Sequence, residues 1–76
     1  AAQKPDLILL DVWMGTHDGR DICRDLKNDP VTRSIPVILV SAGREIEQSA
    51  MEAGADDFIE KPFERTVLLE KIAKYL

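Results

Sequence analysis

The sequence predicts an α/β fold in which three parallel strands alternate with three helices. Aliphatic runs without a polar face, at residues 7–10 and 37–40, are typical of strands that are covered on both sides. Between and after these runs, apolar residues recur every three or four positions, as in amphipathic helices. Connections of this length between successive strands favour a parallel sheet with right-handed crossovers.

The first strand is expected over residues 6–12, after a proline that a strand start tolerates. Residues 14–19 are rich in glycine and polar side chains and predict a turn-rich loop. The first helix is expected over residues 19–28, where Ile22 and Leu26 form an apolar stripe with Cys23 beside it. Pro30 ends this helix, because proline cannot continue the hydrogen-bond ladder.

The second half of the chain repeats the pattern. A strand is expected over residues 35–41, a helix over 44–53 that Gly54 stops, a short strand over 56–59 and a last helix over 64–76. Asp56 and Asp57 come at the start of the third strand, at the edge of the sheet opposite Asp11. We therefore expect them to form a solvated turn and not a metal site.

Composition limits the possible functions. The chain has 76 residues, enough for one small domain, and no apolar run approaches the length of a membrane helix. A membrane protein is therefore not expected. The net charge is −4 and the basic residues are scattered, so direct nucleic-acid binding is not expected either. Cys23 is the single cysteine and is expected in the core, which with no signal peptide in view favours the cytoplasm. His17 has no companions at metal-ligand spacing, so we expect a solvated loop residue.

Each predicted strand ends in a polar side chain. Asp11 ends the first strand, Ser41 the second, and Lys61 follows the third. Because parallel strands end at one edge of a sheet, where ligands bind in open α/β folds, these three side chains should converge. The sequence therefore predicts a small site with a carboxylate, a hydroxyl and an ammonium group.

These motifs resemble the receiver domain of two-component response regulators, which has a flavodoxin-like fold. The resemblance covers residues 5–76 and lies in the acidic strand at 5–14, the Asp18-Gly19 pair, the strand at 37–42 and the segment at 54–63 that ends in Lys-Pro-Phe. It implies that residues 1–76 are a single partial receiver domain, its last three βα units. The family begins with a strand, a helix and a second strand ahead of these units, and the chain opens on Ala1, so we expect a fragment of something longer.

The resemblance also implies a role for each site residue. Asp11 would accept a phosphoryl group from a sensor histidine kinase or a phosphotransfer protein, and Lys61 would be the phosphoryl-binding cation. Ser41 would be the switch hydroxyl and Phe58 the switch aromatic, which relay the change to an output domain or a downstream protein. Asp11 and the main-chain carbonyl of Trp13 would be ligands of Mg²⁺, and the peptide bond before the proline at position 62 would be cis.

Two departures from the family pattern change these expectations. Gly15 stands where the family has proline, which implies a looser loop. The acidic pair that binds Mg²⁺ in the family lies ahead of Ala1, so Mg²⁺ binding is expected of the intact domain and not of this fragment. Without the preceding strand, residues 7–12 would form an exposed edge, and we expect the fragment to self-associate or to remain partly unfolded.

Two other functions are open at this stage. The chain could be a truncated receiver-like interaction module that neither binds Mg²⁺ nor is phosphorylated. It could also be an aspartyl-phosphate phosphatase or ATPase on a related fold. Such enzymes use a second aspartate two residues after the nucleophile, where this chain has Trp13. We therefore do not expect an enzyme.

Overall fold

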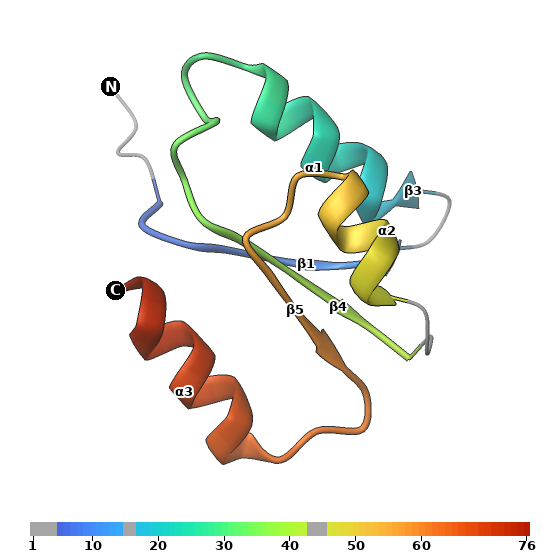
Figure 1. The fold of residues 1–76 in the computed structure, drawn as a ribbon, viewed down its shortest axis with the longest axis vertical. Helices are drawn as coiled ribbons and strands as arrows, with labels where there is room; N and C mark the ends of the chain where they lie inside the picture. Colours follow the sequence, from blue (N-terminus) through green and yellow to red (C-terminus); the bar gives the residue numbers. More distant parts are fainter. Residues whose placement is uncertain (1–4, 15–16, 43–45) are drawn as a thin grey trace.

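The computed structural model describes residues 5–14, 17–42 and 46–76. Its main sheet contains three parallel strands in the order β1-β4-β5, with β1 at Ile8–Asp11, β4 at Val37–Ser41 and β5 at Asp57–Glu60. The helices α1 (Gly19–Asn28) and α2 (Ile46–Glu52) lie on one face of this sheet, and α3 (Arg65–Tyr75) lies on the other (Figure 1). The predicted alternation of strands and helices is therefore confirmed.

Strand β4 lies in the middle of the sheet, and its pairing with β1 and β5 sets the register of those two strands. Asp11 of β1 pairs in register with Val40, and Ser41 pairs with Glu60 of β5. The carboxyl ends of the three strands consequently lie at one edge of the sheet. This central position also explains the unbroken aliphatic run in β4, because Val37, Ile38 and Leu39 are all completely buried.

The main core lies between the sheet and the two helices α1 and α2. Its buried members come from β1 and the residue after it, α1, β4, α2 and the residue that follows α2; they are Leu10, Val12, Cys23, Val37, Leu39, Ala50 and Ala53. Cys23 is confirmed as a core residue, and burial raises the pKa of its thiol. The opposite face is less covered, since no residue of α3 is fully buried and Leu9 in β1 is 45% exposed. No helix among the described residues is long and apolar enough to span a bilayer.

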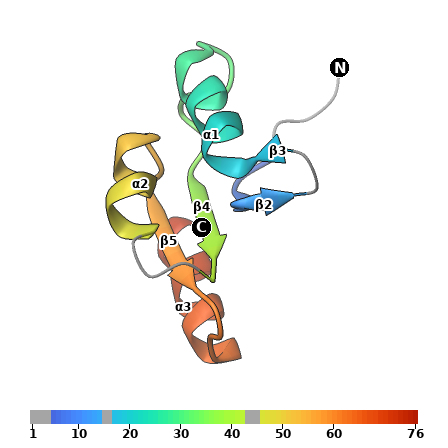
Figure 2. The same cartoon turned by 90° about the vertical axis from the view of Figure 1, so that its right-hand side faces the viewer.

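The expected loop at residues 14–19 is wrong in part. Strand β2 (Trp13–Met14) pairs antiparallel with β3 (His17–Asp18), and the hairpin lies beside the first turn of α1 (Figure 2). His17 is therefore a strand residue and not a loop residue, although it is exposed. Gly15, on which the expected looseness depends, lies outside the described residues, as does the expected start of the second helix at residue 44.

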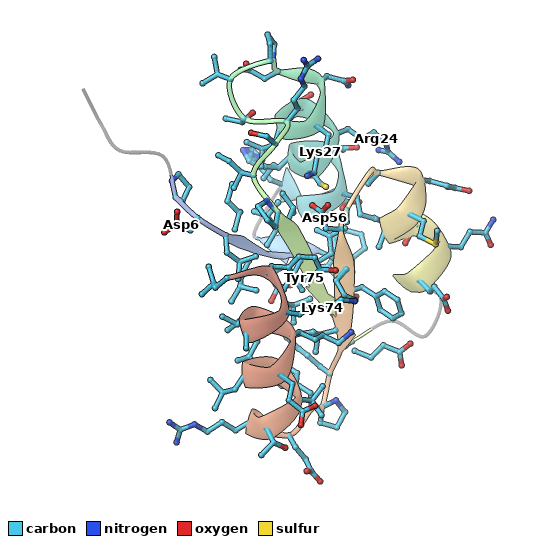
Figure 3. The ribbon with its side chains drawn as sticks, turned by 60° about the vertical axis from the view of Figure 1, so that its left-hand side comes forward. Asp6, Arg24, Lys27, Asp56, Lys74 and Tyr75 are labelled. Carbon is cyan, nitrogen blue, oxygen red and sulfur yellow. The ribbon has the colours of Figure 1, made fainter. Side chains whose placement is uncertain are left out.

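The expected solvated turn at Asp56 and Asp57 is wrong in part, since Asp56 is exposed but both carboxylates form ion pairs and Asp57 belongs to β5. Asp56 accepts hydrogen bonds from the Lys27 ammonium at 2.6 Å and from the backbone N–H of Val37 at 2.8 Å. The Asp57 side chain is 13% exposed and is paired with Lys71 of α3 at 2.8 Å. In Figure 3, Lys27 of α1 and Tyr75 of α3 lie around Asp56 at this edge. The two carboxylates join elements of the fold because backbone donors and cations from both faces meet there.

Candidate functional site

The site is built around an ion pair that crosses the sheet. Asp11 ends β1, and Lys61 follows β5, on the other side of β4. The Lys61 ammonium donates a hydrogen bond to Asp11 Oδ2 at 2.6 Å. Fifty residues separate these two side chains in the sequence, so the parallel sheet brings them together. Their side chains are 37% and 44% exposed, which leaves the carboxylate accessible to a reactant in solution.

The carboxylate of Asp11 is held on both oxygens. The backbone N–H of Trp13 donates to Oδ1 at 3.0 Å, while Oδ2 accepts from Lys61. The bond from Lys61, followed by that from Trp13, lowers the pKa of the Asp11 carboxyl below its ordinary value of 3.8. Asp11 is therefore ionised at neutral pH, and the free lone pairs of its oxygens are available for nucleophilic attack.

Ser41 and the peptide link of Lys61 lie next to each other at the end of β4. The backbone N–H of Lys61 donates to the carbonyl oxygen of Ser41 at 2.7 Å, and Ser41 is 4% exposed. This bond continues the pairing of β4 with β5 by one residue. It fixes the position of the Lys61 backbone relative to the end of β4. The bond between Lys61 and Pro62 is cis, as the resemblance implied.

Phe58 belongs to β5 and pairs in register with Leu39 of β4. It is half-buried and packs against the core cluster between the sheet and the helices α1 and α2. The geometry thus brings Asp11 and Lys61 into contact, with the backbone of Ser41 bonded to that of Lys61. Phe58, which lies opposite the middle of β4, does not belong to this contact.

The chain after Asp11 folds back on itself through the β2–β3 hairpin. The backbone N–H of Gly19 donates to the carbonyl oxygen of Val12 at 2.6 Å. A Cβ at position 19 would lie 2.2 Å from the carbonyl oxygen of Asp11, so only glycine fits there. The close approach of Gly19 therefore fixes the backbone that carries Asp11.

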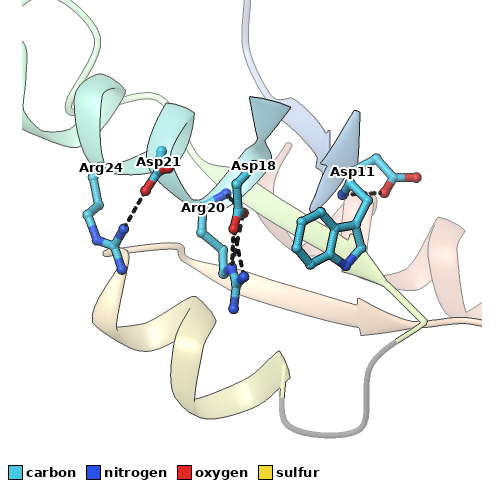
Figure 4. Close-up of polar contacts among 6 residues, drawn as sticks. Asp11, Asp18, Arg20, Asp21 and Arg24 are labelled. Atoms are coloured by element: carbon cyan, nitrogen blue, oxygen red, sulfur yellow. Dashed lines mark hydrogen bonds and ion pairs between the residues drawn. The ribbon is translucent and has the colours of Figure 1, made fainter. Parts of the chain in front are cut away.

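Asp18 anchors the hairpin to α1. Its carboxylate accepts the backbone N–H of Arg20 at 2.9 Å and caps the helix, and it also forms a bidentate pair with the Arg20 guanidinium, shown in Figure 4 together with the Asp21–Arg24 pair. Arg20 lies over the ring of Trp13, 5.7 Å from its centroid. Trp13 is 68% exposed, so this indole forms part of the surface beside Asp11.

The resemblance implies two oxygen ligands of Mg²⁺ at this site, the Asp11 carboxylate and the Trp13 carbonyl. No group of three or more His, Cys, Asp or Glu side chains that could hold a metal occurs within the described parts of the chain. Mg²⁺ demands near-octahedral oxygen coordination, and the Asp11 carboxylate is already paired with Lys61. The oxygen donors among residues 5–14, 17–42 and 46–76 therefore do not fit a complete magnesium site.

Three features were missed by reasoning from the sequence, two near the site and one at the opposite edge of the sheet. The capping role of Asp18 has a signal, because aspartate immediately before an apolar periodic segment is a typical helix start. The close approach of Gly19 to the Asp11 backbone has a weaker signal in the sequence, the Asp-Gly pair. The contacts of Lys71 and Tyr75 with Asp57 have none, since polar residues on a helix do not indicate their tertiary partners.

Comparison with known proteins identifies the family. The sequence matches the family model described as "Response regulator receiver domain" over residues 1–73. The chain belongs to the response regulator receiver domain family. The family, the fold and the role in two-component signalling that the resemblance implied are confirmed.

Individual relatives agree with this assignment. Response regulator PleD of Caulobacter vibrioides is 46% identical over 74 residues, which cover 95% of this chain and 16% of PleD. The signal receiver domain of a signal transduction histidine kinase from Syntrophus aciditrophicus has a TM-score of 0.84 and 42% identity, covering 97% of this chain and 58% of that one. The receiver domain of sensor histidine kinase PA1611 from Pseudomonas aeruginosa, with a magnesium ion in its active-site cleft, has a TM-score of 0.83 and 27% identity; 96% of this chain and 62% of that one are covered. The chain thus spans less than two thirds of each of these relatives.

Proposed function

We propose that Asp11 is the phosphoacceptor of this receiver domain. The observation that carries the proposal is the 2.6 Å contact between the Asp11 carboxylate and the Lys61 ammonium at the carboxyl edge of the sheet. The donor would be a phosphohistidine of a sensor histidine kinase or of a phosphotransfer protein. An Asp11 oxygen attacks phosphorus, an acyl phosphate forms, and the bond from phosphorus to the histidine nitrogen breaks.

Lys61 has the chemistry to assist this transfer. A carboxylate and a phosphoryl group repel each other, and a cation placed between them offsets the charge of the transferred group. The Lys61 ammonium, now bonded to Asp11 Oδ2, would instead donate to a phosphoryl oxygen. Ser41 would then donate its hydroxyl to another phosphoryl oxygen, and the change would be relayed through Phe58 to an output domain or a downstream protein.

Magnesium is assigned to the intact domain. The Asp11 carboxylate and the Trp13 carbonyl would be two of its ligands, and we assign the remaining oxygens to parts of the protein beyond residues 1–76. The ion that PA1611 holds in its cleft supports this assignment. We likewise propose that residues 1–76 are the last three βα units of the domain, in line with the 58% of the Syntrophus receiver that they cover.

The proposed setting is a cytoplasmic signalling protein. The net charge of −4 disfavours direct binding of this domain to nucleic acid or to an anionic membrane, so its partners would be proteins. The domain itself would be a substrate of phosphoryl transfer and not an enzyme with a turnover of its own. A module that only binds other proteins is the alternative.

Phosphorylation of the full-length protein by acetyl phosphate distinguishes these two functions. We expect Mg²⁺-dependent incorporation of one hydroxylamine-labile phosphoryl group, and its loss in Asp11→Asn. Asp18→Asn is the matched control, because Asp18 caps α1 and does not touch Asp11 in the described contacts. Incorporation that persists in Asp11→Asn contradicts the assignment, and no incorporation into the wild type at any Mg²⁺ concentration favours the binding module.

A further inference from the structure

One contact of the candidate switch aromatic reaches a helix on the other side of the sheet. Side chains alternate between the two faces of a strand, so Asp57 and Phe58 of β5 point to opposite faces. Asp57 contacts α3, whereas Phe58 packs against the core on the side of α1 and α2. The ammonium of Lys71, a residue of α3, nevertheless lies over the ring of Phe58, 5.4 Å from its centroid.

Lys71 reaches both faces because β5 is the last strand of the described sheet. Its ammonium donates to Asp57 Oδ1 at 2.8 Å while lying over the Phe58 ring. The aromatic face attracts a cation at this distance, and the pair with Asp57 is partly shielded, with side chains 29% and 13% exposed. One side chain therefore joins α3, the carboxylate of Asp57 and the ring of Phe58.

Tyr75 strengthens the same attachment one helical turn further along α3. Its hydroxyl donates to the carbonyl oxygen of Asp56 at 2.9 Å and lies 3.3 Å from Asp57 Oδ2. Lys71 and Tyr75 are four residues apart and so lie on one face of the helix. Burial raises the pKa of the Asp57 carboxyl, but its bonds to Lys71 and to the backbone N–H of Phe58 outweigh burial and lower it overall.

These polar contacts matter because the apolar attachment of α3 is weak. No residue of this helix is fully buried. Its side chains Leu68 and Ile72 are half-buried, and Val67 and Leu69 are 38% and 50% exposed. A helix held in this way responds to the loss of one or two contacts more than a helix that is buried in a core.

We propose that Lys71 is a positioning residue that holds the ring of Phe58 and couples it to α3. Movement of the ring would weaken the contact with Lys71 and loosen α3, and α3 is therefore the element that reports the state of the site. The inference rests on the proposed function, in which Phe58 is the switch aromatic. It adds the route by which a change at Phe58 leaves the sheet.

The test uses the full-length protein and three substitutions in α3. Lys71→Met keeps an unbranched side chain and removes the charge, and Lys71→Arg keeps the cation. Lys74→Met is the matched control, since Lys74 lies over the ring of Tyr75 instead, 5.4 Å from its centroid. The readouts are the ring resonances of Phe58 by nuclear magnetic resonance and the amide exchange rates of residues 65–75, measured before and after phosphorylation.

Without phosphorylation, we expect Lys71→Met to shift the Phe58 ring resonances and to speed amide exchange in α3 about fivefold, as the loss of an ion pair and a cation–π contact implies. Lys71→Arg should restore both values, and Lys74→Met should leave the ring resonances unchanged. An unchanged Phe58 ring in Lys71→Met, or equal effects of Lys71→Met and Lys74→Met on that ring, overturns the proposal.

Phosphorylation separates failure of this proposal from failure of the proposed function. In the wild type, α3 exchange should rise on phosphorylation, and in Lys71→Met this further rise should be lost while Asp11 is still phosphorylated. A Phe58 ring that ignores phosphorylation contradicts its role as the switch aromatic, whatever Lys71 does. A ring that responds without any change in α3 contradicts the role of Lys71 alone.

Discussion

The close approach of Gly19 to the backbone of Asp11 gives a sharp prediction for Gly19→Ala. The new Cβ would lie 2.2 Å from the Asp11 carbonyl oxygen and 2.9 Å from the carbonyl carbon. Real Cβ atoms essentially never come closer than 3.0 Å, so the two segments must separate by about 0.8 Å. The obstacle is backbone and not the end of a flexible side chain, so the movement is transmitted to Asp11 itself.

The expected magnitude follows from this displacement. Inserting a methyl group into a closely packed position costs about 1–3 kcal/mol of the free energy of unfolding. A displacement of nearly 1 Å at the reacting carboxylate should also slow phosphorylation by acetyl phosphate by roughly 10- to 100-fold. Urea unfolding followed by circular dichroism measures the first effect, and the initial rate of phosphorylation of the full-length protein measures the second.

Gly54→Ala is the matched control. Gly54 has a φ of 85°, which costs an L residue about 1–2 kcal/mol. A Cβ added at Gly54 would lie 3.4 Å from the Lys27 Cγ, its nearest neighbour, which is ordinary van der Waals contact. Gly54→Ala should therefore destabilise the protein to a similar extent and leave the phosphorylation rate unchanged at temperatures where both variants are folded. Equal rates for Gly19→Ala and the wild type would refute the reasoning.

Three further predictions follow from the ion pairs and the sheet edge. Lys61→Ala should change the free energy of unfolding by less than about 1 kcal/mol, because the pair with Asp11 is exposed, yet it should strongly reduce phosphorylation; a large fall in melting temperature would count against this assignment. The pKa of the Asp57 carboxyl is lower in the folded protein than its ordinary value of 3.8. The ionised carboxylate therefore stabilises the fold above that ordinary pKa, and this contribution is lost as the pH falls through the folded pKa. In acid titrations, the difference in unfolding free energy between the wild type and Asp57→Asn should shrink below about pH 4. Residues 1–76 alone should self-associate through β1 or be partly unfolded, because β1 ends the described sheet and Leu9 is 45% exposed; a compact monomer in sedimentation equilibrium with strongly protected amides at 7–10 would refute this.

Much of the fold follows from the sequence because its signals are local. Aliphatic runs mark β1 and β4, and the apolar stripe with Pro30 gives the observed bounds of α1, Gly19–Asn28. The meeting of Asp11 and Lys61 is also predictable, since parallel strands of one sheet end at the same edge.

What could not be predicted depends on tertiary neighbours. The Asp56-Asp57 pair has the composition of a solvated turn, and only the folded chain brings Lys27, the Val37 N–H and Lys71 to it. The β2–β3 hairpin contains only two residues in each strand, too few for an alternating pattern to be visible. The cation over Phe58 comes from a helix on the other face of the sheet, which no spacing along the sequence reveals.

The most direct test of the central claim is to locate the phosphoryl group chemically. The full-length protein is phosphorylated with acetyl phosphate and Mg²⁺ and treated with borohydride, which reduces an aspartyl phosphate to homoserine, and its peptides are then sequenced by mass spectrometry. We predict homoserine at position 11, with aspartate retained at positions 18, 56 and 57. Homoserine at position 18, 56 or 57 would contradict the assignment of Asp11 as the phosphoacceptor. So would the absence of homoserine at position 11 in a protein that has taken up phosphate.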